Sequence, residues 1–153
     1  MKCIELNKGH VAIVDDEDFE RLAQYRWNVS DSGHARRSVR IDGKVKTIYM
    51  HHEILTPPPG KEVDHRNCNP LDNRRDNLRI ATRGQNNMNK GAQSNSVTGI
   101  KGVSFDKRTG KFHAKITVNG SQKFLGYFKT KEQAEAAYAE AAKLHHGDFH
   151  RLN

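Results

Sequence analysis

The chain has 153 residues, which is enough for one ordinary domain or two small ones, since ~100–200 residues per domain is usual. Only 35% of the residues are hydrophobic and the mean hydropathy is −0.88, so we expect thin cores rather than one large globule. No apolar run approaches the ~18 residues that span a bilayer, and the first residues lack the apolar core of a signal peptide. These features exclude a membrane protein and predict a soluble, cytoplasmic one.

The formal net charge of +8 is distributed unevenly along the chain. Residues 1–60 are neutral overall, whereas residues 61–95 carry +3 and residues 96–153 carry +5. A clustered basic excess is typical of proteins that bind the phosphate backbone of nucleic acid, and a solvated basic face is the alternative. Charge alone does not separate the two, so the motifs must decide.

The two cysteines, Cys3 and Cys68, are far apart and neither lies in a C-x-x-C motif. This argues against a zinc ribbon and a disulfide framework, and it favours a cytosolic redox environment. His51 and His52 could form a structural zinc site with Cys68. However, consecutive residues of a strand point to opposite faces, and we expect a strand there, so the spacing argues against that site.

The first fifty-five residues alternate like paired strands, with DSG and IDG as turn signals between them. Between the second and third strands, residues 15–25 place Phe19, Leu22 and Tyr25 at helical spacing, with acidic residues loaded at the start of the helix. We therefore expect a β-rich unit with one short helix. The expected strands are residues 2–6, 9–16, 25–30, 34–41 and 46–55.

A proline-rich connector, residues 56–62, contains three of the four prolines and cannot be a helix or a central strand. The segment that follows predicts a strand ending in Asp64 and His65, a polar loop, a returning strand over residues 77–81, and a short helix from about Arg83 to Lys90. Thr82 and Gln85 have the spacing of a capping box at the start of that helix.

This arrangement lets Asp64, His65 and Asn86 converge. One carboxylate and one amide oxygen form a poor zinc site but suit Mg²⁺ or Mn²⁺, which retains waters and accepts phosphate ligands. Phosphodiester hydrolysis needs a base that deprotonates water, and a histidine with a pKa near ~6.5 is mostly neutral at pH 7. The pattern favours a metal-dependent nuclease with His65 as base, although an Asp-His pair in a loop is more often two solvated side chains.

The stretch VDHRNCNPLDNRRDNLRIATRGQNNMN resembles the HNH endonucleases of phage and intron origin, which often read V-D-H, D-N-R, N-L-R and Q-N in this order. The resemblance implies a ββα-metal core in which His65 is the general base, Asp64 and Asn86 hold one Mg²⁺ or Mn²⁺ ion, and the Asn77 amide secures the loop. Asn86 stands where other branches of the family have histidine.

Residues 1–58 also look like the leader that precedes this core. Beside such a site, some of the loop arginines are expected to clamp the DNA backbone rather than only to solubilise the loop. These are Arg66, Arg74, Arg75, Arg79 and Arg83.

A polar segment, residues 91–99, has the composition of a flexible linker, and the chain changes character after it. Strands are expected over residues 99–105, 111–118 and 122–128, joined by tight turns and followed by a helix. Thr130 and Gln133 form its capping box and Gly147 its stop. Its apolar stripe is predicted to be Ala134, Ala137, Tyr138, Ala141 and Leu144.

In the middle strand the apolar residues share one face, while Lys111, His113, Lys115 and Thr117 share the other. The helix is expected to cover the apolar face and to leave a basic open face that can enter a major groove. The alternative is a solvated lysine face on a protein-binding module.

Residues 99–153 are similar to the DNA-binding domain of plant ethylene-response factors, through Gly102-Val103, K-F-x-A-x-I, L-G-x-F, A-x-x-A-Y and the closing Leu152-Asn153. By that resemblance a base-reading face would comprise Ser104, Asp106, Lys107, Arg108, Lys115, Thr117, Gln122 and Phe124. Several of these positions hold arginine or tryptophan in the plant domains, so the plant target sequence does not transfer. Phosphate contacts are expected from Lys101, Lys107, Arg108, Lys111 and Lys123.

The sequence therefore predicts an α+β protein with an HNH endonuclease domain (residues 1–92, with its core at 59–92), a linker (93–98) and a DNA-binding domain (99–153). We expect a phage-encoded homing endonuclease of a mobile element. It would act on double-stranded DNA as a monomer or weak dimer, without a small-molecule cofactor. One active site per chain favours nicking of one strand, and double-strand cleavage by two copies is the alternative. The alternatives are a non-catalytic DNA-binding regulator and a nuclease for structured RNA.

Overall fold

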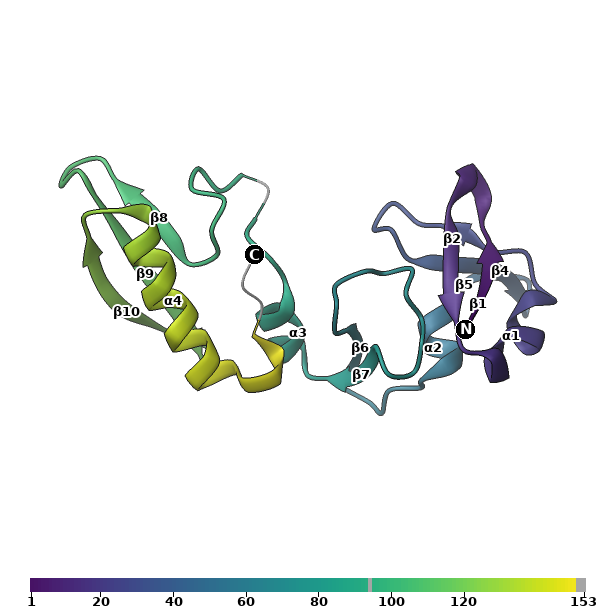
Figure 1. Ribbon diagram of the computed structural model, residues 1–153. Coiled ribbons are helices and arrows are strands. Elements are labelled where there is room, and N and C mark those ends of the chain that lie inside the picture. Colours follow the sequence, from purple (N-terminus) through teal and green to yellow (C-terminus); the bar gives the residue numbers. More distant parts are fainter. Residues whose placement is uncertain (94, 151–153) are drawn as a thin grey trace. The chain divides into compact units, whose positions relative to one another are not determined.

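Two short antiparallel strands, β1 (Lys2–Glu5) and β2 (Val11–Val14), begin the chain in the computed structural model, which describes residues 1–93 and 95–150 (Figure 1). A single turn of 3₁₀ helix, Asn7–Gly9, joins them. Helix α1 (Asp16–Ala23) follows, with three acidic residues in its first turn, where the helix dipole favours them. Both the strand pair and the acidic helix start were predicted from the sequence and are confirmed.

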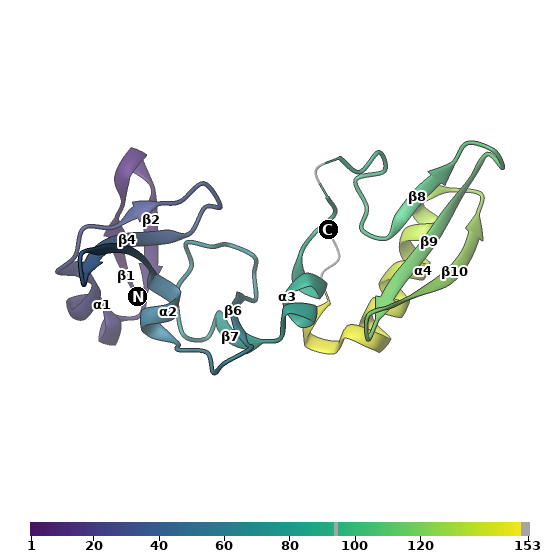
Figure 2. The same cartoon turned by 180° about the vertical axis from the view of Figure 1, so that it is seen from behind.

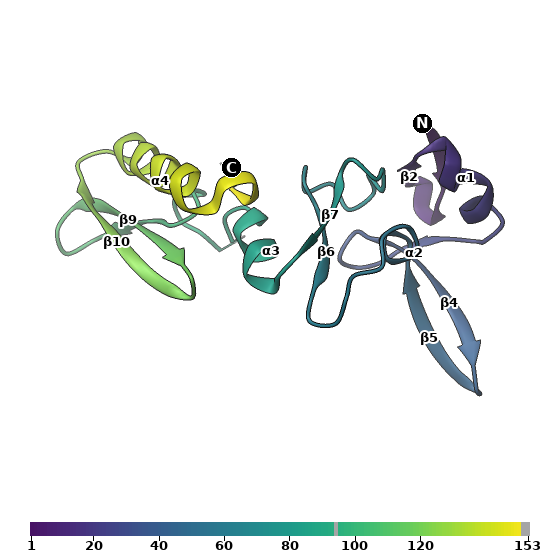
Figure 3. The ribbon, with the colours of Figure 1, turned by 90° about the horizontal axis from the view of Figure 1, so that it is seen from below.

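The second sheet has the order β3-β4-β5, formed by Asn28–Val29, Ala35–Ile41 and Lys44–Tyr49. Figure 3 shows β4 and β5 as a long two-stranded ribbon. Asp42 and Gly43 join these strands, and both have positive φ, as the predicted tight turn requires.

The strand predicted over residues 46–55 is wrong in its second half. Strand β5 ends at Tyr49, and residues Met50–Ile54 form the short helix α2. The helix buries Met50, His51 and Ile54, while its neighbour His52 is exposed. The expectation that His51 and His52 occupy opposite faces of a strand therefore does not apply.

Strands β6 (Glu62–His65) and β7 (Leu78–Ala81) pair antiparallel, with Asp64 opposite Arg79 and His65 opposite Leu78. The intervening segment, residues 66–77, is called the 66–77 loop below. Together with the preceding elements they surround a small hydrophobic core. Its largest fully buried members are Trp27, Leu22, Met50 and Val14.

Helix α3 (Arg83–Asn89) lies where the sequence predicts a helix. The three-stranded sheet after it has the order β10-β9-β8, formed by Ser121–Phe128, Lys111–Val118 and Val103–Asp106. Helix α4 (Lys131–His146) then packs on this sheet, behind it in Figure 2, and a 3₁₀ turn, Gly147–Phe149, follows. The predicted capping box of Thr130 and Gln133 is present, and the helix ends at Gly147 as expected.

The second core lies between α4 and the apolar face of β9, where Ala114 and Ile116 are buried. Gly102 has a φ of +72°, and a Cβ there would collide with Tyr138 and the Lys115 carbonyl, so glycine is required. The buried residues of α4 are Ala134, Tyr138, Ala142 and His146. The predicted apolar stripe is wrong at its end, because Leu144 is 78% exposed: it lies two residues from Ala142, which places it on the opposite side of the helix.

The chain divides into two compact units, Met1–Thr82 and Arg83–Asn153, here called the N-terminal and C-terminal units. Helix α3 belongs to the second of these. The predicted domain limits, with a linker at 93–98, stay a prediction. Ser94 of that linker and the Leu152-Asn153 landmark lie outside the described residues. No helix among the described residues is long and apolar enough to cross a membrane.

Candidate nuclease site and nucleic-acid interface

The 66–77 loop is polar, yet Asp72, Asn73 and Asn77 within it are buried. Its backbone pairs with strand β2, because Ile13 N donates to the Leu71 carbonyl and Asn73 N donates to the Ile13 carbonyl, both at 2.8 Å. Asn73 has no exposed surface and Asp72 is 3% exposed. The loop is therefore part of the folded unit, held in place by main-chain bonds to a distant strand.

Asn77 bridges the two ends of the loop through its side-chain amide. Its Oδ1 accepts from the backbone N–H of Asn67 at 3.0 Å, and its Nδ2 donates to the Asp72 carbonyl at 2.7 Å. The side chain is 7% exposed, and its bond to the Asp72 carbonyl is buried. Two hydrogen bonds from one buried amide fix the path of the chain beside His65.

His65 lies at the end of β6 and is 6% exposed. Its Nε2 lies 3.3 Å from Asn73 Oδ1. Because an amide oxygen only accepts, the ring nitrogen must donate, which places the lone pair of the neutral imidazole on Nδ1. Burial lowers the pKa of His65, while Asn73 and the carboxylates of Asp64 and Asp72 oppose that shift. The ring is therefore neutral at pH 7 and can accept a proton.

Asp64 precedes His65 and is 5% exposed. Its Oδ2 accepts a hydrogen bond from Arg79 Nε at 2.7 Å, a buried ion pair between facing residues of β6 and β7. A carboxylate has two oxygens with about four acceptor positions, so this pair is compatible with a further ligand. As a hard oxygen donor, Asp64 fits a cation of the Mg²⁺ class.

Asn86, the second predicted metal ligand, lies on α3 in the C-terminal unit. The structure describes the two units separately, so the pairing of Asp64 with Asn86 stays a prediction. Asp64, His65 and Asn77 are held within the N-terminal unit by the contacts above.

Two of the loop arginines form ion pairs inside the N-terminal unit. Arg74 donates to Asp72 at 2.8 and 2.7 Å, and this contact lowers the pKa of Asp72. Arg75 donates to Asp18 of α1 at 2.8 and 2.9 Å. Burial of Asp18 would raise its pKa, but the hydrogen bonds from Arg75 and Arg21 outweigh burial and lower it. Together with Arg79, these side chains stabilise the loop, and their predicted DNA contacts stay a prediction.

A cluster of three histidines was not predicted from the sequence. His34, His51 and His65 each offer one ring nitrogen, and these nitrogens all lie within 4.8 Å of one another. His34 immediately precedes β4, His51 lies in α2 and His65 ends β6. No spacing in the sequence marks this cluster, because the convergence of the three segments depends on the tertiary fold.

The open face of the C-terminal sheet carries most of the predicted base-reading residues, whereas Lys107 and Arg108 lie in the β8–β9 turn. The register pairs Ser104 with His113, Lys115 with Phe124, and Thr117 with Gln122, which places them on the side opposite α4. A groove over this face is bordered by Asn87 and Met88 of α3. Phe124 is 54% exposed, so its ring is available to a ligand.

One aromatic residue on this face, Tyr127, was missed in the sequence. Tyr127 lies three positions after Phe124, but a bulge between Phe124 and Gly126 shifts the register and brings both rings to one face. Tyr127 lies 5.3 Å from Phe124 and 5.9 Å from His113 between ring centroids. The face is therefore aromatic as well as basic.

Of the remaining residues that were predicted to contact DNA, some are exposed and others form hydrogen bonds within the unit. Lys101 donates to the carbonyls of Asn87, Met88 and Lys90 at 3.0, 2.7 and 2.6 Å, so its ammonium group caps the end of α3. Exposed positions are occupied by Arg83, Lys107, Arg108, Lys111 and Lys123. Asp106 accepts from the backbone N–H of Arg108 at 2.9 Å and shapes the β8–β9 turn.

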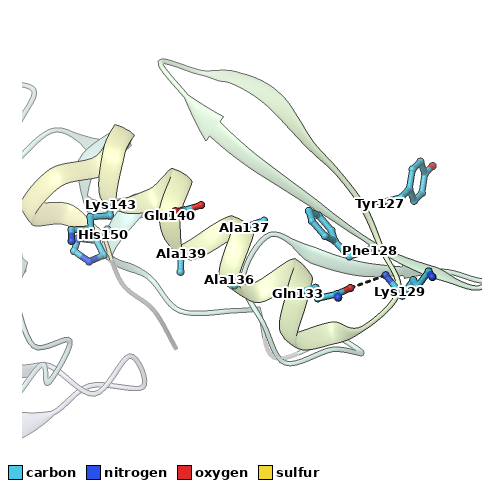
Figure 4. Close-up of a pocket in the computed structure, with 10 residues that line it drawn as sticks. All are labelled: Tyr127, Phe128, Lys129, Gln133, Ala136, Ala137, Ala139, Glu140, Lys143 and His150. Atoms are coloured by element: carbon cyan, nitrogen blue, oxygen red, sulfur yellow. Dashed lines mark hydrogen bonds between the residues drawn. The ribbon is translucent and has the colours of Figure 1, made fainter.

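A second groove of the C-terminal unit runs along α4 (Figure 4). Alanines of α4 line much of it, and Gln133 accepts from the Lys129 backbone N–H at 3.2 Å at one end. It lies against the helix rather than on the open face of the sheet. The predicted DNA-contacting residues do not line it.

Comparison with known proteins identifies the family of the 66–77 loop and its two strands. The HNH endonuclease family matches residues 56–88. An uncharacterized HNH endonuclease of Acanthamoeba polyphaga mimivirus is 28% identical over 148 residues, covering 93% of this chain and 74% of that protein. Protein 3.8 of Escherichia phage T7 is 31% identical over 98 residues, covering 62% of this chain and 78% of that protein. No solved structure matches the chain significantly.

HNH nucleases generally use a divalent metal ion, and the match coincides with the segment that contains Asp64, His65 and Asn77. The chain contains an HNH endonuclease domain and belongs to the same family as the viral Protein 3.8 of phage T7.

Proposed function

We propose that the protein is a DNA endonuclease of the HNH homing type, encoded by a phage as part of a mobile element and active in the cytoplasm of the host. It hydrolyses phosphodiester bonds and nicks one strand of the duplex. The observation that carries the proposal is the environment of His65: a buried, neutral imidazole next to Asp64, with Asn73 fixing its tautomer.

In this proposal His65 is the general base. Its Nδ1 accepts a proton from water, and the water oxygen forms a new bond to phosphorus while the bond from phosphorus to the 3′ oxygen breaks. The leaving 3′ oxygen takes up a proton from solvent. The products are a 5′ phosphate and a 3′ hydroxyl, as the family resemblance implies. Asn73 keeps the lone pair of His65 on Nδ1, and Asn77 holds the loop that carries Asn73.

Asp64 and Asn86 are proposed to hold one Mg²⁺ or Mn²⁺ ion, which supplies a positive charge that stabilises the oxygens of the reacting phosphate. Arg79 orients the Asp64 carboxylate through the bond at 2.7 Å. Removal of Arg79 would leave the buried carboxylate without its cation partner, so its role is one of positioning.

The C-terminal unit is proposed to bind duplex DNA through the open face of its sheet, in the manner of the plant ethylene-response domain. Lys115, Thr117, Gln122 and Phe124 are exposed there, with Tyr127 beside them. Residues 96–153 also carry a net charge of +5, which favours a polyanionic ligand. The fold of three strands and a helix, with one face free of the helix, supports this proposal.

The test is the conversion of supercoiled plasmid DNA to the open-circular form by the full chain with Mg²⁺ or Mn²⁺. We expect nicking that a chelator abolishes, and a rate that falls ~10²–10⁴-fold in His65→Ala, the range for loss of a general base. His145→Ala, which changes an exposed histidine of α4, is the matched control.

Full activity in His65→Ala would refute the base assignment, and DNA binding without cleavage would indicate a regulator. A preference for structured RNA over duplex DNA would reassign the substrate.

A further inference from the structure

Of the three clustered histidines in the N-terminal unit, the mechanism above uses only His65. His34, His51 and His65 place one nitrogen each within 4.8 Å of the other two. Their ring centroids are 5.1, 5.6 and 5.2 Å apart. Three imidazoles from distant segments thus converge within one compact unit.

The nitrogen atoms of this cluster are not all satisfied by the surrounding protein. His51 is 6% exposed, and its Nδ1 is buried with no hydrogen-bond partner among the described residues. A buried polar atom without a partner costs free energy, about 1–3 kcal/mol, and native proteins rarely tolerate one without a reason. A cation bound to Nδ1 would supply the missing interaction.

Two neighbouring side chains orient the other rings. Ser32 Oγ lies 3.0 Å from His34 Nδ1, and Asn73 Oδ1 lies 3.3 Å from His65 Nε2. Hydrogen bonds of this kind are typical of histidines that ligate a metal, because they fix the ring and its tautomer. Burial also lowers the pKa of His34 and His51, so both rings are neutral and keep a lone pair at pH 7.

The donor set selects the class of ion. Three imidazoles suit Zn²⁺, Co²⁺, Ni²⁺ or Cu²⁺ and do not suit Mg²⁺, which prefers oxygen. Zinc–nitrogen distances of about 2.0–2.1 Å in a tetrahedral site correspond to nitrogens roughly 3.3 Å apart. Each ring would therefore have to move inward by less than about 1 Å, a shift that side-chain torsions can provide.

We propose that His34, His51 and His65 form a binding site for one borderline transition-metal ion such as Zn²⁺, with a fourth position open to water. The site differs from the proposed Asp64–Asn86 site in its donors and in the ion it selects. Because His65 contributes a ligand, an ion bound there occupies the imidazole needed as a base. Zinc therefore inhibits cleavage; this consequence rests on the proposed function, whereas binding does not.

The binding test uses the full chain, treated with a chelator and then freed of it, without DNA. Calorimetric titration with Zn²⁺ is expected to show one ion that His34→Ala and His51→Ala each weaken roughly tenfold or more, as loss of a ligand requires. Co²⁺ is expected to give the intense visible absorption of a tetrahedral site, reduced in the same variants. Because His51 is buried, circular dichroism must show that its variant is folded, and the half-buried His34 provides the second variant.

The matched control is His52→Ala, which removes an exposed histidine adjacent to His51 on the same helix. It is expected to leave zinc binding unchanged. Absence of binding in the wild-type chain, or equal loss in His52→Ala, would overturn the proposal.

Plasmid nicking with Mg²⁺ is measured separately, with and without Zn²⁺. Zinc binding without any nicking would refute the proposed function and keep the site, whereas nicking that Zn²⁺ leaves unchanged would refute inhibition.

Discussion

The 66–77 loop and the open face of the C-terminal sheet are built from similar polar residues but use them in opposite ways. In the loop, Asn77, Arg74 and Arg75 are engaged with partners within the unit, and Asp72, Asn73 and Asn77 are buried. On the sheet, Lys115 and Phe124 face solvent. Burial with satisfied hydrogen bonds fixes groups for chemistry, whereas exposure leaves them available to a ligand. Mutations in the loop should therefore affect stability, and mutations on the sheet should affect binding.

The largest stability effect is expected from Arg79→Ala. The change leaves the buried Asp64 carboxylate without its cation, and breaking a buried ion pair on one side costs about 3–5 kcal/mol. Urea unfolding followed by the fluorescence of Trp27, the single tryptophan and a core residue of the N-terminal unit, measures this loss.

Arg108→Ala removes an exposed arginine of the C-terminal unit and is the matched control, with an expected change below about 0.5 kcal/mol. If both variants changed the Trp27 transition equally, the contrast between a buried and an exposed arginine would fail.

A smaller effect is expected from Asn77→Ala, which deletes both side-chain bonds across the loop. The Asn67 N–H and the buried Asp72 carbonyl would lose their partner, at a cost of about 2 kcal/mol in the free energy of unfolding. Plasmid nicking should also fall, because the loop positions Asn73 against His65.

Asn77→Asp serves as a graded control, because its carboxylate can still accept from Asn67 but cannot donate to Asp72. It should fall between the wild type and Asn77→Ala. A stability equal to that of the wild type in Asn77→Ala would show that the loop is held by its backbone bonds to β2 alone.

The elements of both units could largely be predicted from the sequence, because alternation, turn residues and capping boxes are local signals. The β9 strand, its Asn119-Gly120 turn and the Thr130 capping box are examples. Helix α2 could not be predicted in this way, since five residues are too few for a helical period. Its conformation is set by the burial of Met50 and Ile54 in the core.

The candidate site was predictable only as far as its local motif extends. Asp64 and His65 are marked by the strand end and the V-D-H motif. In contrast, the internal ion pairs of Arg75 and Arg79 depend on partners 57 and 15 residues away, which composition does not reveal. The convergence of His34, His51 and His65 likewise joins three elements, and no spacing rule connects them.

When a chelator keeps the three histidines free of metal, we expect the N-terminal unit to lose stability in acid. Burial, together with the nearby His52, His65 and His34, lowers the pKa of His51 to about 2 from an ordinary value of 6.5. Between these values the unfolded chain binds a proton that the folded chain does not, so stability falls as the pH falls, by about 1.4 kcal/mol per pH unit for this group.

The measurement is the Trp27 unfolding transition at a series of pH values below 6.5. His51→Gln should reduce the slope of the unfolding free energy against pH by the equivalent of about one bound proton. His145→Gln, which changes an exposed histidine of the C-terminal unit, should leave this slope unchanged. An unchanged slope in His51→Gln would show that this ring is not buried in its neutral form.

The smallest stability effect, below about 0.5 kcal/mol, is expected from Lys115→Ala on the open face of the sheet. Its ammonium is exposed, so the change belongs to the ligand-binding side of the comparison. If Lys115 contacts one phosphate, the slope of log K against log salt for duplex DNA should fall by about 0.9, because one fewer counterion is released. Fluorescence anisotropy of labelled DNA at several salt concentrations measures this slope.

Glu135→Ala, which changes an exposed acidic residue of α4 in the same unit, is the control and should not reduce the slope. If Lys115→Ala changed neither the slope nor the affinity for duplex DNA, the DNA would lie on another surface of the C-terminal unit.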